Sequence, residues 1–256
     1  MADRQGLLIW SDIPVSPLVF DVPGGPAQAR ALLANDILAN QNHPSILTWS
    51  IANELPTPAT RAEASYVAKT VALAHRLDPT RPVAMAVSTW PGVPCQHAYG
   101  PLDVIGVNEY FGWYGAGGGT TDDRVGLGPF LDSLRACYPH RALMISEFGF
   151  DGARTGPFEE RGTYSFQADA VAYHLNVFAS KPWLSGAMYF LLHDGVTSPG
   201  YTGGDPFPLP PFIFKGLIDL ADRMKPAWTV VASIYHHTVQ IAPAPGGGRG
   251  ATRGQT

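Results

Sequence analysis

Charged residues are scarce in this chain, and long hydrophobic runs are absent as well. Only 15% of the 256 residues are charged, against the usual quarter, so much of the chain must pack into an interior. No stretch approaches the roughly 18 consecutive apolar residues that a membrane span requires. The sequence therefore predicts a globular protein without a membrane partner.

Basic clusters and cysteines are also few. The formal net charge is -4 and there is no run of Lys or Arg, which excludes the basic footprint of a nucleic-acid-binding protein. The two cysteines, Cys95 and Cys137, do not form a disulfide framework, and we predict that both are buried thiols. No HExxH or CxxC motif is present, so the sequence predicts neither a metal nor a cofactor.

The first ten residues, MADRQGLLIW, lack the succession of charged, apolar and small residues that marks a secretory signal. This favours a cytoplasmic location only where residue 1 is the natural start of the protein. The compartment therefore stays open at this point.

Short apolar runs do occur, and they alternate with segments of helical periodicity, which is typical of parallel βαβ units. The predicted strands are residues 6–10, 45–53, 82–87, 103–110, 142–148 and 186–192. The predicted helices are residues 59–79, 129–138, 166–180 and 225–237. Residues 243–256 are rich in Gly and Pro without apolar content, which predicts a disordered tail after a domain of residues 1–242.

Two α/β folds have this order of elements. A doubly wound sheet tolerates six strands, but it usually carries a glycine-rich phosphate turn, and neither GxGxxG nor GxxxxGK[ST] is present. The GAGGG run from Gly115 to Gly119 lacks the Lys-Ser/Thr partner of a phosphate loop. A (β/α)8 barrel needs about eight strands, so six would leave two unpaired edges.

Two predicted strands end by presenting a carboxylate. HPSILTWSIANELP places Asn53 and Glu54 directly after a buried strand, and ALMISEFGFDG does the same with Glu147. The two glutamates are 93 residues apart, close to three βα units of roughly 30 residues each, so they are predicted to face each other across the mouth of a barrel. Facing carboxylates are the minimal machinery for cleaving a glycosidic bond. The alternative is that each glutamate is an ordinary strand-end charge in a salt bridge.

Four segments resemble the barrel domain of glycoside hydrolase family 2, which includes β-galactosidases, β-glucuronidases and β-mannosidases. They are NHPSILTWSIANE, DVIGVNEYFGWY, LMISEFGFDG and GLIDLADRMKPAW, and the likeness runs from about residue 6 to residue 242. The resemblance implies an α/β (β/α)8 TIM barrel that lacks its first two βα units, with six strands visible. Met1 is accordingly expected to be an internal start, which would remove any signal peptide from view.

The resemblance also implies roles for matching positions. Glu54 matches the acid/base and Glu147 the nucleophile of a retaining double displacement by an exo-acting enzyme. Asn53 matches the amide that binds the sugar 2-hydroxyl, and Tyr110 matches the tyrosine that hydrogen-bonds the nucleophile.

Other matching positions would shape the sugar site. Trp113 and Tyr114 match loop aromatics near the sugar, with packing at the barrel rim as the alternative reading. Phe190 occupies a position where many members carry a Trp that forms the floor of the sugar site. β-Glucuronidases read the sugar carboxylate with an Asn-x-Lys pair, and here Ile213 replaces the Asn while Lys215 is retained. The absence of this Asn therefore argues against a glucuronide substrate.

Three hypotheses follow. The first is a β-glycosidase of galactosidase or glucuronidase type with a carbohydrate substrate and no cofactor. The second is a truncated, non-catalytic carbohydrate-binding or remnant domain, because the missing units would open the site and leave barrel edges free for self-association. The third is a parallel-sheet enzyme that uses one glutamate with a metal. The sequence does not specify the sugar or the oligomeric state.

Overall fold

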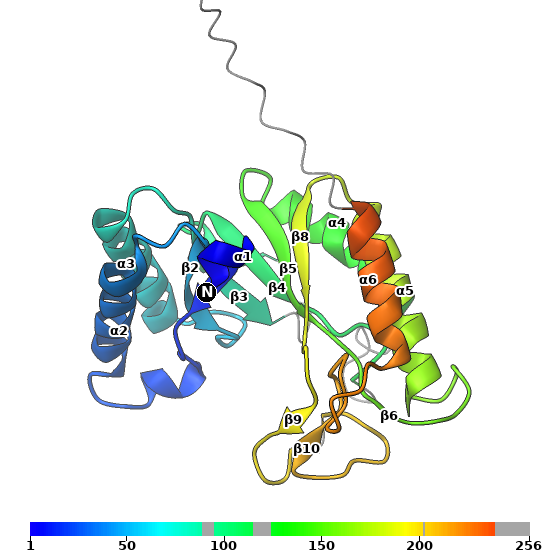
Figure 1. Ribbon diagram of the computed structural model, residues 1–256. Helices are drawn as coiled ribbons and strands as arrows, with labels where there is room; N and C mark the ends of the chain where they lie inside the picture. Colours follow the sequence, from blue (N-terminus) through cyan, green and yellow to red (C-terminus); the bar gives the residue numbers. More distant parts are fainter. Residues whose placement is uncertain (89–94, 115–123, 202, 239–256) are drawn as a thin grey trace, which may run out of the picture.

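The computed structural model contains a six-stranded parallel sheet that curls into part of a barrel (Figure 1). It describes residues 1–88, 95–114, 124–201 and 203–238. The strands, in spatial order, are β1 (Ile9–Asp12), β2 (Ile46–Asn53), β3 (Val83–Ser88), β4 (Val104–Asn108), β5 (Ala142–Phe148) and β8 (Leu184–Tyr189). The spatial order follows the chain order, as in a barrel wall that is wound in one direction.

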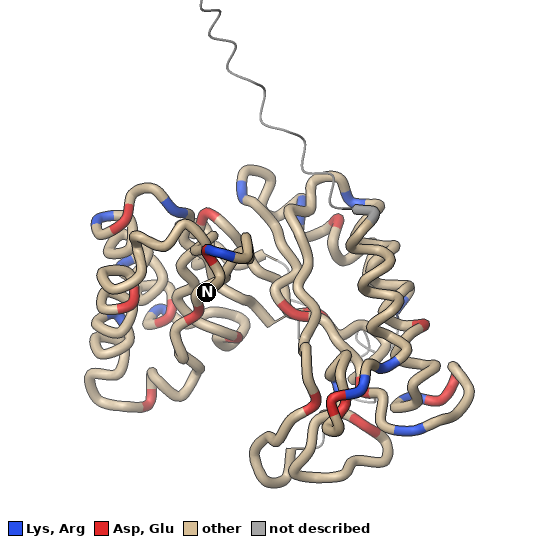
Figure 2. Tube along the Cα trace, in the orientation of Figure 1, with Lys and Arg blue, Asp and Glu red and all other residues tan. Residues whose placement is uncertain are grey.

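Helices connect most of these strands on the outer face of the curl (Figure 1). The long helices are α2 (Gly25–Asn40), α3 (Arg61–Leu77), α4 (Leu127–Cys137), α5 (Tyr164–Ala179) and α6 (Pro226–Thr238). Helices α2 and α3 pack side by side at one end of the sheet, and α5 and α6 at the other. Charged residues lie mainly on the helices and loops (Figure 2).

Shorter elements complete the described chain. They are α1 (Ala2–Gln5), the 3-10 turns η1 (Pro17–Phe20), η2 (His97–Tyr99) and η3 (Arg124–Gly126), the pair β6 (Gly152–Arg154) with β7 (Gly162–Thr163), and the pair β9 (Gly195–Val196) with β10 (Phe212–Ile213). The β9–β10 pair lies below the carboxyl end of β8 in Figure 1. No helix in the described parts of the chain is both long and apolar enough to cross a membrane.

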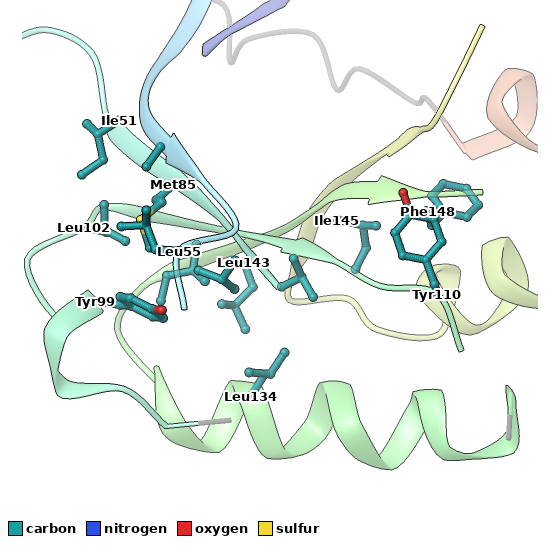
Figure 3. Close-up of a cluster of buried hydrophobic side chains, with 14 of the residues drawn as sticks. Ile51, Leu55, Met85, Tyr99, Leu102, Tyr110, Leu134, Leu143, Ile145 and Phe148 are labelled. Carbon is teal, nitrogen blue, oxygen red and sulfur yellow. The ribbon is translucent and has the colours of Figure 1, made fainter. Parts of the chain in front are cut away.

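The core lies between the sheet and its helices. Strand β2 is rich in β-branched and aromatic residues and is buried along most of its length, as expected of a central strand in a parallel sheet. Its Trp49 is fully buried and donates its indole N–H to Asp78 at 3.0 Å. Figure 3 shows Leu134 of α4 facing the strand residues Leu143 and Ile145. The buried residues of α4 and β5 belong to the same hydrophobic cluster.

Helix α3 illustrates how local sequence sets an element boundary. The Thr60 hydroxyl accepts a hydrogen bond from the Glu63 amide, and the Glu63 side chain accepts one from the Thr60 amide. This capping box satisfies two backbone donors that a helix start leaves open. The helix therefore begins immediately after the loop that carries Glu54.

All six predicted strands and the four predicted helices are present. Helix α2 was not predicted, because apolar residues occupy several of its sides and give it little helical periodicity. Leu33 and Ile37 are fully buried, whereas Leu32 and Leu38 are exposed. Within the described residues β1 and β8 each pair with one neighbour only, so the curl is open between them. The predicted tail, residues 243–256, and the GAGGG run lie outside the described residues.

The prediction of two buried thiols is wrong. Cys95 and Cys137 form a disulfide across 42 residues of sequence, and Cys95 is exposed rather than buried. The bond joins the segment before η2 to the last residue of α4. Sequence spacing could not reveal this pairing, because it depends on the two Cα atoms lying 5.3 Å apart in the fold.

Candidate active site

The carboxyl ends of β2, β4 and β5 converge at one edge of the sheet. Asn53 ends β2, Asn108 ends β4, and Glu147 is the next-to-last residue of β5. Residue pairing aligns Asn108 with Glu147 on the neighbouring strand. Parallel strands bring their carboxyl ends to the same side, which is where barrel enzymes carry their chemistry.

The Asn108 side chain joins both predicted glutamates. Its amide nitrogen Nδ2 lies 3.1 Å from Glu54 Oε1 and 3.2 Å from Glu147 Oε2. The same nitrogen lies 3.0 Å from Asn53 Oδ1. The hydroxyl of Ser146 donates to Asn108 Oδ1 at 2.7 Å, which orients the amide so that its hydrogens face the acids. Asn108 is buried, whereas the Asn53, Glu54 and Glu147 side chains that it contacts are partly exposed.

Glu54 adopts an unusual backbone conformation. Its φ angle is 51°, in the left-handed region that non-glycine residues rarely occupy. Its amide donates to the Ala86 carbonyl at 2.9 Å, which extends the pairing of β2 with β3 beyond the end of the strand. Non-glycine residues in this conformation cluster at functional sites, where surrounding contacts hold them in place.

The environment of Glu147 disfavours its negative charge. Burial raises the pKa of Glu147 from 4.5 to about 7, and the nearby Glu54 carboxylate adds to the effect. The hydroxyl of Tyr110 donates to Glu147 Oε1 and acts in the opposite direction. The two glutamates are thus near enough for the charge of one to affect the protonation of the other.

A buried cation lies next to this cluster. Lys215 is fully buried, and its Nζ contacts the Gly203 carbonyl at 3.0 Å and Asp151 Oδ1 at 3.4 Å. The same Nζ lies 4.4–5.3 Å from the ring centroids of three aromatic residues, namely Trp113, Tyr114 and Tyr110. Burial lowers the pKa of Lys215 to about 8 and raises that of Asp151 to about 6. Each charge of this pair therefore depends on the other for compensation.

The predicted aromatic residues occupy different positions around the cluster. Trp113 is fully buried, and its indole N–H donates to the Gly203 carbonyl at 2.6 Å. The Tyr114 hydroxyl lies 3.0 Å from that of Tyr201. Phe190 is partly buried, and its amide donates to the Phe148 carbonyl, one residue after Glu147, at 2.8 Å.

The described structure therefore brings together Glu54, Glu147, Asn53 and Tyr110. The ammonium of Lys215 lies 5.3 Å from the centre of the Tyr110 ring. Sequence reasoning did not single out Asn108, although it follows an apolar strand just as Asn53 does. That shared pattern was the available signal. Among the described residues no group of three or more His, Cys, Asp or Glu is positioned to hold a metal ion.

Comparisons with known proteins identify the domain type. Residues 27–167, a little over half of the chain, match the model of the glycosyl hydrolases family 2 TIM barrel domain. Among curated proteins, the β-glucuronidase of Paenibacillus borealis is 34% identical over 128 residues, covering 44% of this chain and 21% of that protein. The β-glucuronidase of Streptococcus agalactiae is 25% identical over 217 residues, covering 77% of this chain and 36% of that protein.

Solved structures agree in fold. A β-galacturonidase from Eisenbergiella tayi bound to galacturonate superposes with a TM-score of 0.79 and 24% identity, covering 92% of this chain and 42% of that one. A Bifidobacterium dentium β-glucuronidase complexed with coumarin-3-O-glucuronide gives a TM-score of 0.76 and 25% identity, covering 92% and 38%. The chain thus spans only about a fifth to two fifths of the length of these relatives.

Proposed function

The chain belongs to glycosyl hydrolase family 2, and on that premise we propose that it hydrolyses β-glycosidic bonds at chain ends by a retaining double displacement. Glu147 is the proposed nucleophile and Glu54 the proposed acid/base. One observation carries the proposal, namely the single Asn108 amide nitrogen that contacts both carboxylates. The coarser conclusion, a glycoside hydrolase domain, follows from the family alone.

The bridge limits the separation of the two acids. Because one nitrogen lies 3.1 Å and 3.2 Å from them, Glu54 Oε1 and Glu147 Oε2 are at most about 6.3 Å apart. Retaining glycosidases hold their carboxyl groups about 5–5.5 Å apart, whereas inverting ones need about 6.5–9.5 Å to admit a water. The bound supports the retaining arrangement.

The proposed chemistry proceeds in two balanced steps. The ionised Glu147 carboxylate attacks the anomeric carbon while protonated Glu54 transfers its proton to the departing oxygen, so the glycosidic bond breaks as the Glu147–sugar bond forms. Glu54 then removes a proton from water, which attacks the anomeric carbon and releases Glu147. The donation from Tyr110 to Glu147 supports the ionised nucleophile.

The neighbouring residues have proposed roles in holding the sugar. Asn53 would bind the 2-hydroxyl, with its Oδ1 oriented by the Asn108 amide. Phe190 would form part of the floor of the site. Trp113 is fully buried, so its proposed contribution is to support Lys215 and the Gly203 loop from behind rather than to stack on the sugar.

The surroundings of Lys215 favour a neutral sugar over a uronate, although the relatives named above are uronidases. The ammonium of Lys215 already contacts Asp151 and a backbone carbonyl, and three aromatic rings enclose it. A sugar carboxylate would have to displace these contacts next to a buried aspartate. The Ile213 side chain moreover offers no hydrogen bond where β-glucuronidases carry the Asn of their carboxylate-reading pair. A β-galactoside is therefore a better proposed substrate than a β-glucuronide.

A panel of aryl β-glycosides tests the proposal directly. We expect turnover of a β-galactoside with release of the β-anomer first, which proton NMR detects. Initial release of the α-anomer would contradict retention, and faster turnover of a glucuronide or galacturonide would contradict the assignment of Lys215.

The open curl motivates a second candidate function. Since β1 and β8 each have a single neighbour among the described residues, the barrel wall is incomplete between them, and the proposed alternative is a carbohydrate-binding domain without turnover. Titration with a sugar lactone separates the two functions, because binding without turnover of any aryl glycoside favours the second. Self-association through the two edges is a related proposal, which sedimentation analysis of the chain would test.

A further inference from the structure

A buried acid and a buried histidine face each other directly behind the proposed catalytic centre. Glu109 and His174 are both fully buried, and Glu109 Oε2 lies 3.5 Å from His174 Nε2. Glu109 stands in the chain between Asn108 and Tyr110, the two residues that contact Glu147. The pair has no part in the double displacement described above.

The hydrogen bonds around the pair determine where its protons are. His174 Nδ1 lies 2.7 Å from the Ala170 carbonyl oxygen, which can only accept, so Nδ1 carries a hydrogen. Glu109 Oε2 accepts a hydrogen bond from the Phe111 amide at 3.1 Å. If His174 were neutral and Glu109 ionised, Nε2 and Oε2 would present lone pairs to each other.

The surroundings of the pair do not stabilise a neutral His174 next to an ionised Glu109. The His174 ring packs among the rings of Phe148, Phe150, Tyr173 and Phe178. An ionised carboxylate among such groups is costly without a paired cation. His174 Nε2 also lacks a hydrogen-bond partner within the described residues, and Glu109 Oε2 is the polar atom that faces it.

We propose that Glu109 and His174 hold one proton between them, and that this buried pair positions Asn108 and Tyr110 against the two site glutamates. The positioning part rests on the function proposed above. Asn108 and Tyr110 both contact Glu147 while Glu109 faces His174 of α5, so the three side chains alternate, and anchoring Glu109 toward α5 directs its two neighbours to the opposite face. The Glu109 amide also donates to the Glu147 carbonyl at 2.9 Å, which couples the anchor to the strand of the proposed nucleophile.

Substitutions at position 109 separate shape from charge. In Glu109→Gln the amide nitrogen can take the place of Oε2 and donate to His174 Nε2, which replaces the shared proton by a fixed one and gives up only the hydrogen bond from the Phe111 amide. In Glu109→Leu both interactions are lost at similar volume. In the double variant Glu109→Leu/His174→Phe the polar pair becomes apolar, so folding is retained without the anchor.

Steady-state kinetics per functional site provide the first test. A 2-deoxy-2-fluoroglycoside that traps Glu147 counts the functional sites, so that kcat is not confounded by misfolded protein. We expect Glu109→Gln to keep at least a third of kcat. We expect Glu109→Leu and the double variant to lose about 10- to 100-fold in kcat with KM within threefold. An unchanged kcat per site in these two variants overturns the positioning role.

A buried glutamate elsewhere in the fold is the matched control. Glu63 forms the capping box of α3, and Glu63→Leu should lower thermal stability while leaving kcat per site unchanged. An equal loss of kcat per site in this control would also overturn the positioning role, because removing any buried acid would then have the same effect on kcat.

Nitrogen-15 NMR of labelled histidine tests the shared proton without any turnover. Neither ring nitrogen of His174 should give the signal of a free acceptor in the unmodified protein, whereas Nε2 should do so in Glu109→Leu. A free acceptor signal in the unmodified protein overturns the proposal. If the chain binds sugar without turnover, the proposed function fails separately. Dissociation constants for a sugar lactone then replace kcat, with about tenfold weaker binding expected for Glu109→Leu and no weakening for Glu109→Gln.

Discussion

Replacing Glu147 by glutamine should inactivate the protein and at the same time stabilise it at alkaline pH. The pKa of Glu147 is raised from 4.5 to about 7 by burial, so the folded protein resists ionisation of this carboxyl more than the unfolded chain does. The ionised form therefore opposes folding by on the order of 3 kcal/mol. Glutamine is neutral at every pH and removes this term.

The pH dependence has a defined sign. At low pH the carboxyl is protonated in both the folded and the unfolded state, so the wild type loses nothing relative to Glu147→Gln. As pH rises from about 4.5 to 7, the unfolded chain ionises more easily and the wild type becomes relatively less stable. The stability advantage of Glu147→Gln should thus grow by on the order of 2 kcal/mol between pH 5 and pH 8.5.

Urea unfolding followed by circular dichroism at the two pH values measures this difference. Glu159→Gln is the control, because Glu159 is exposed and the same substitution there should have no comparable effect. An advantage for Glu147→Gln that is equal at both pH values would refute the reasoning. The wild-type kcat/KM should also fall below about pH 7, since the proposed nucleophile is then protonated.

Three further predictions concern other parts of the molecule. Glu54→Ala should reduce turnover of glycosides with poor leaving groups at least 100-fold more than that of dinitrophenyl glycosides, and equal losses would contradict its role as the acid. Asn108→Asp adds a charge between the two carboxylates and should move the acidic limb of the pH–rate profile upward by about one pH unit; an unmoved limb would argue against the bridge. Replacing Cys95 and Cys137 by serine should lower the free energy of unfolding by about 2–4 kcal/mol, because the disulfide closes a loop of 42 residues. Two free thiols in the native protein would exclude that bond.

The elements of the sheet were predictable because their signals are local. Each strand is a short apolar run, and the residue after the run shows which side chain reaches the carboxyl edge. Glu54 and Glu147 could therefore be singled out from the strand pattern alone. Helix α2 was not predicted because the helical periodicity of its apolar residues is weak, and its burial depends on contacts with α3 and β2.

The connections between elements could not be predicted, because they depend on register and loop paths. The Asn108 bridge requires β4 to align its last residue with Glu147, and a shift of one residue would turn its side chain away. The enclosure of Lys215 combines it with Asp151 and Trp113, which are far apart in the chain and meet only in the fold. The spacing of these residues in the sequence does not indicate that they are in contact in the fold.

The left-handed backbone of Glu54 has an implication for protein engineering. A non-glycine residue at φ 51° costs about 1–2 kcal/mol, whereas glycine adopts this conformation freely and asparagine with less difficulty. A library randomised at position 54 and sorted only for heat resistance should accordingly enrich glycine and asparagine. Sorting the same library for product formation should bring glutamate back.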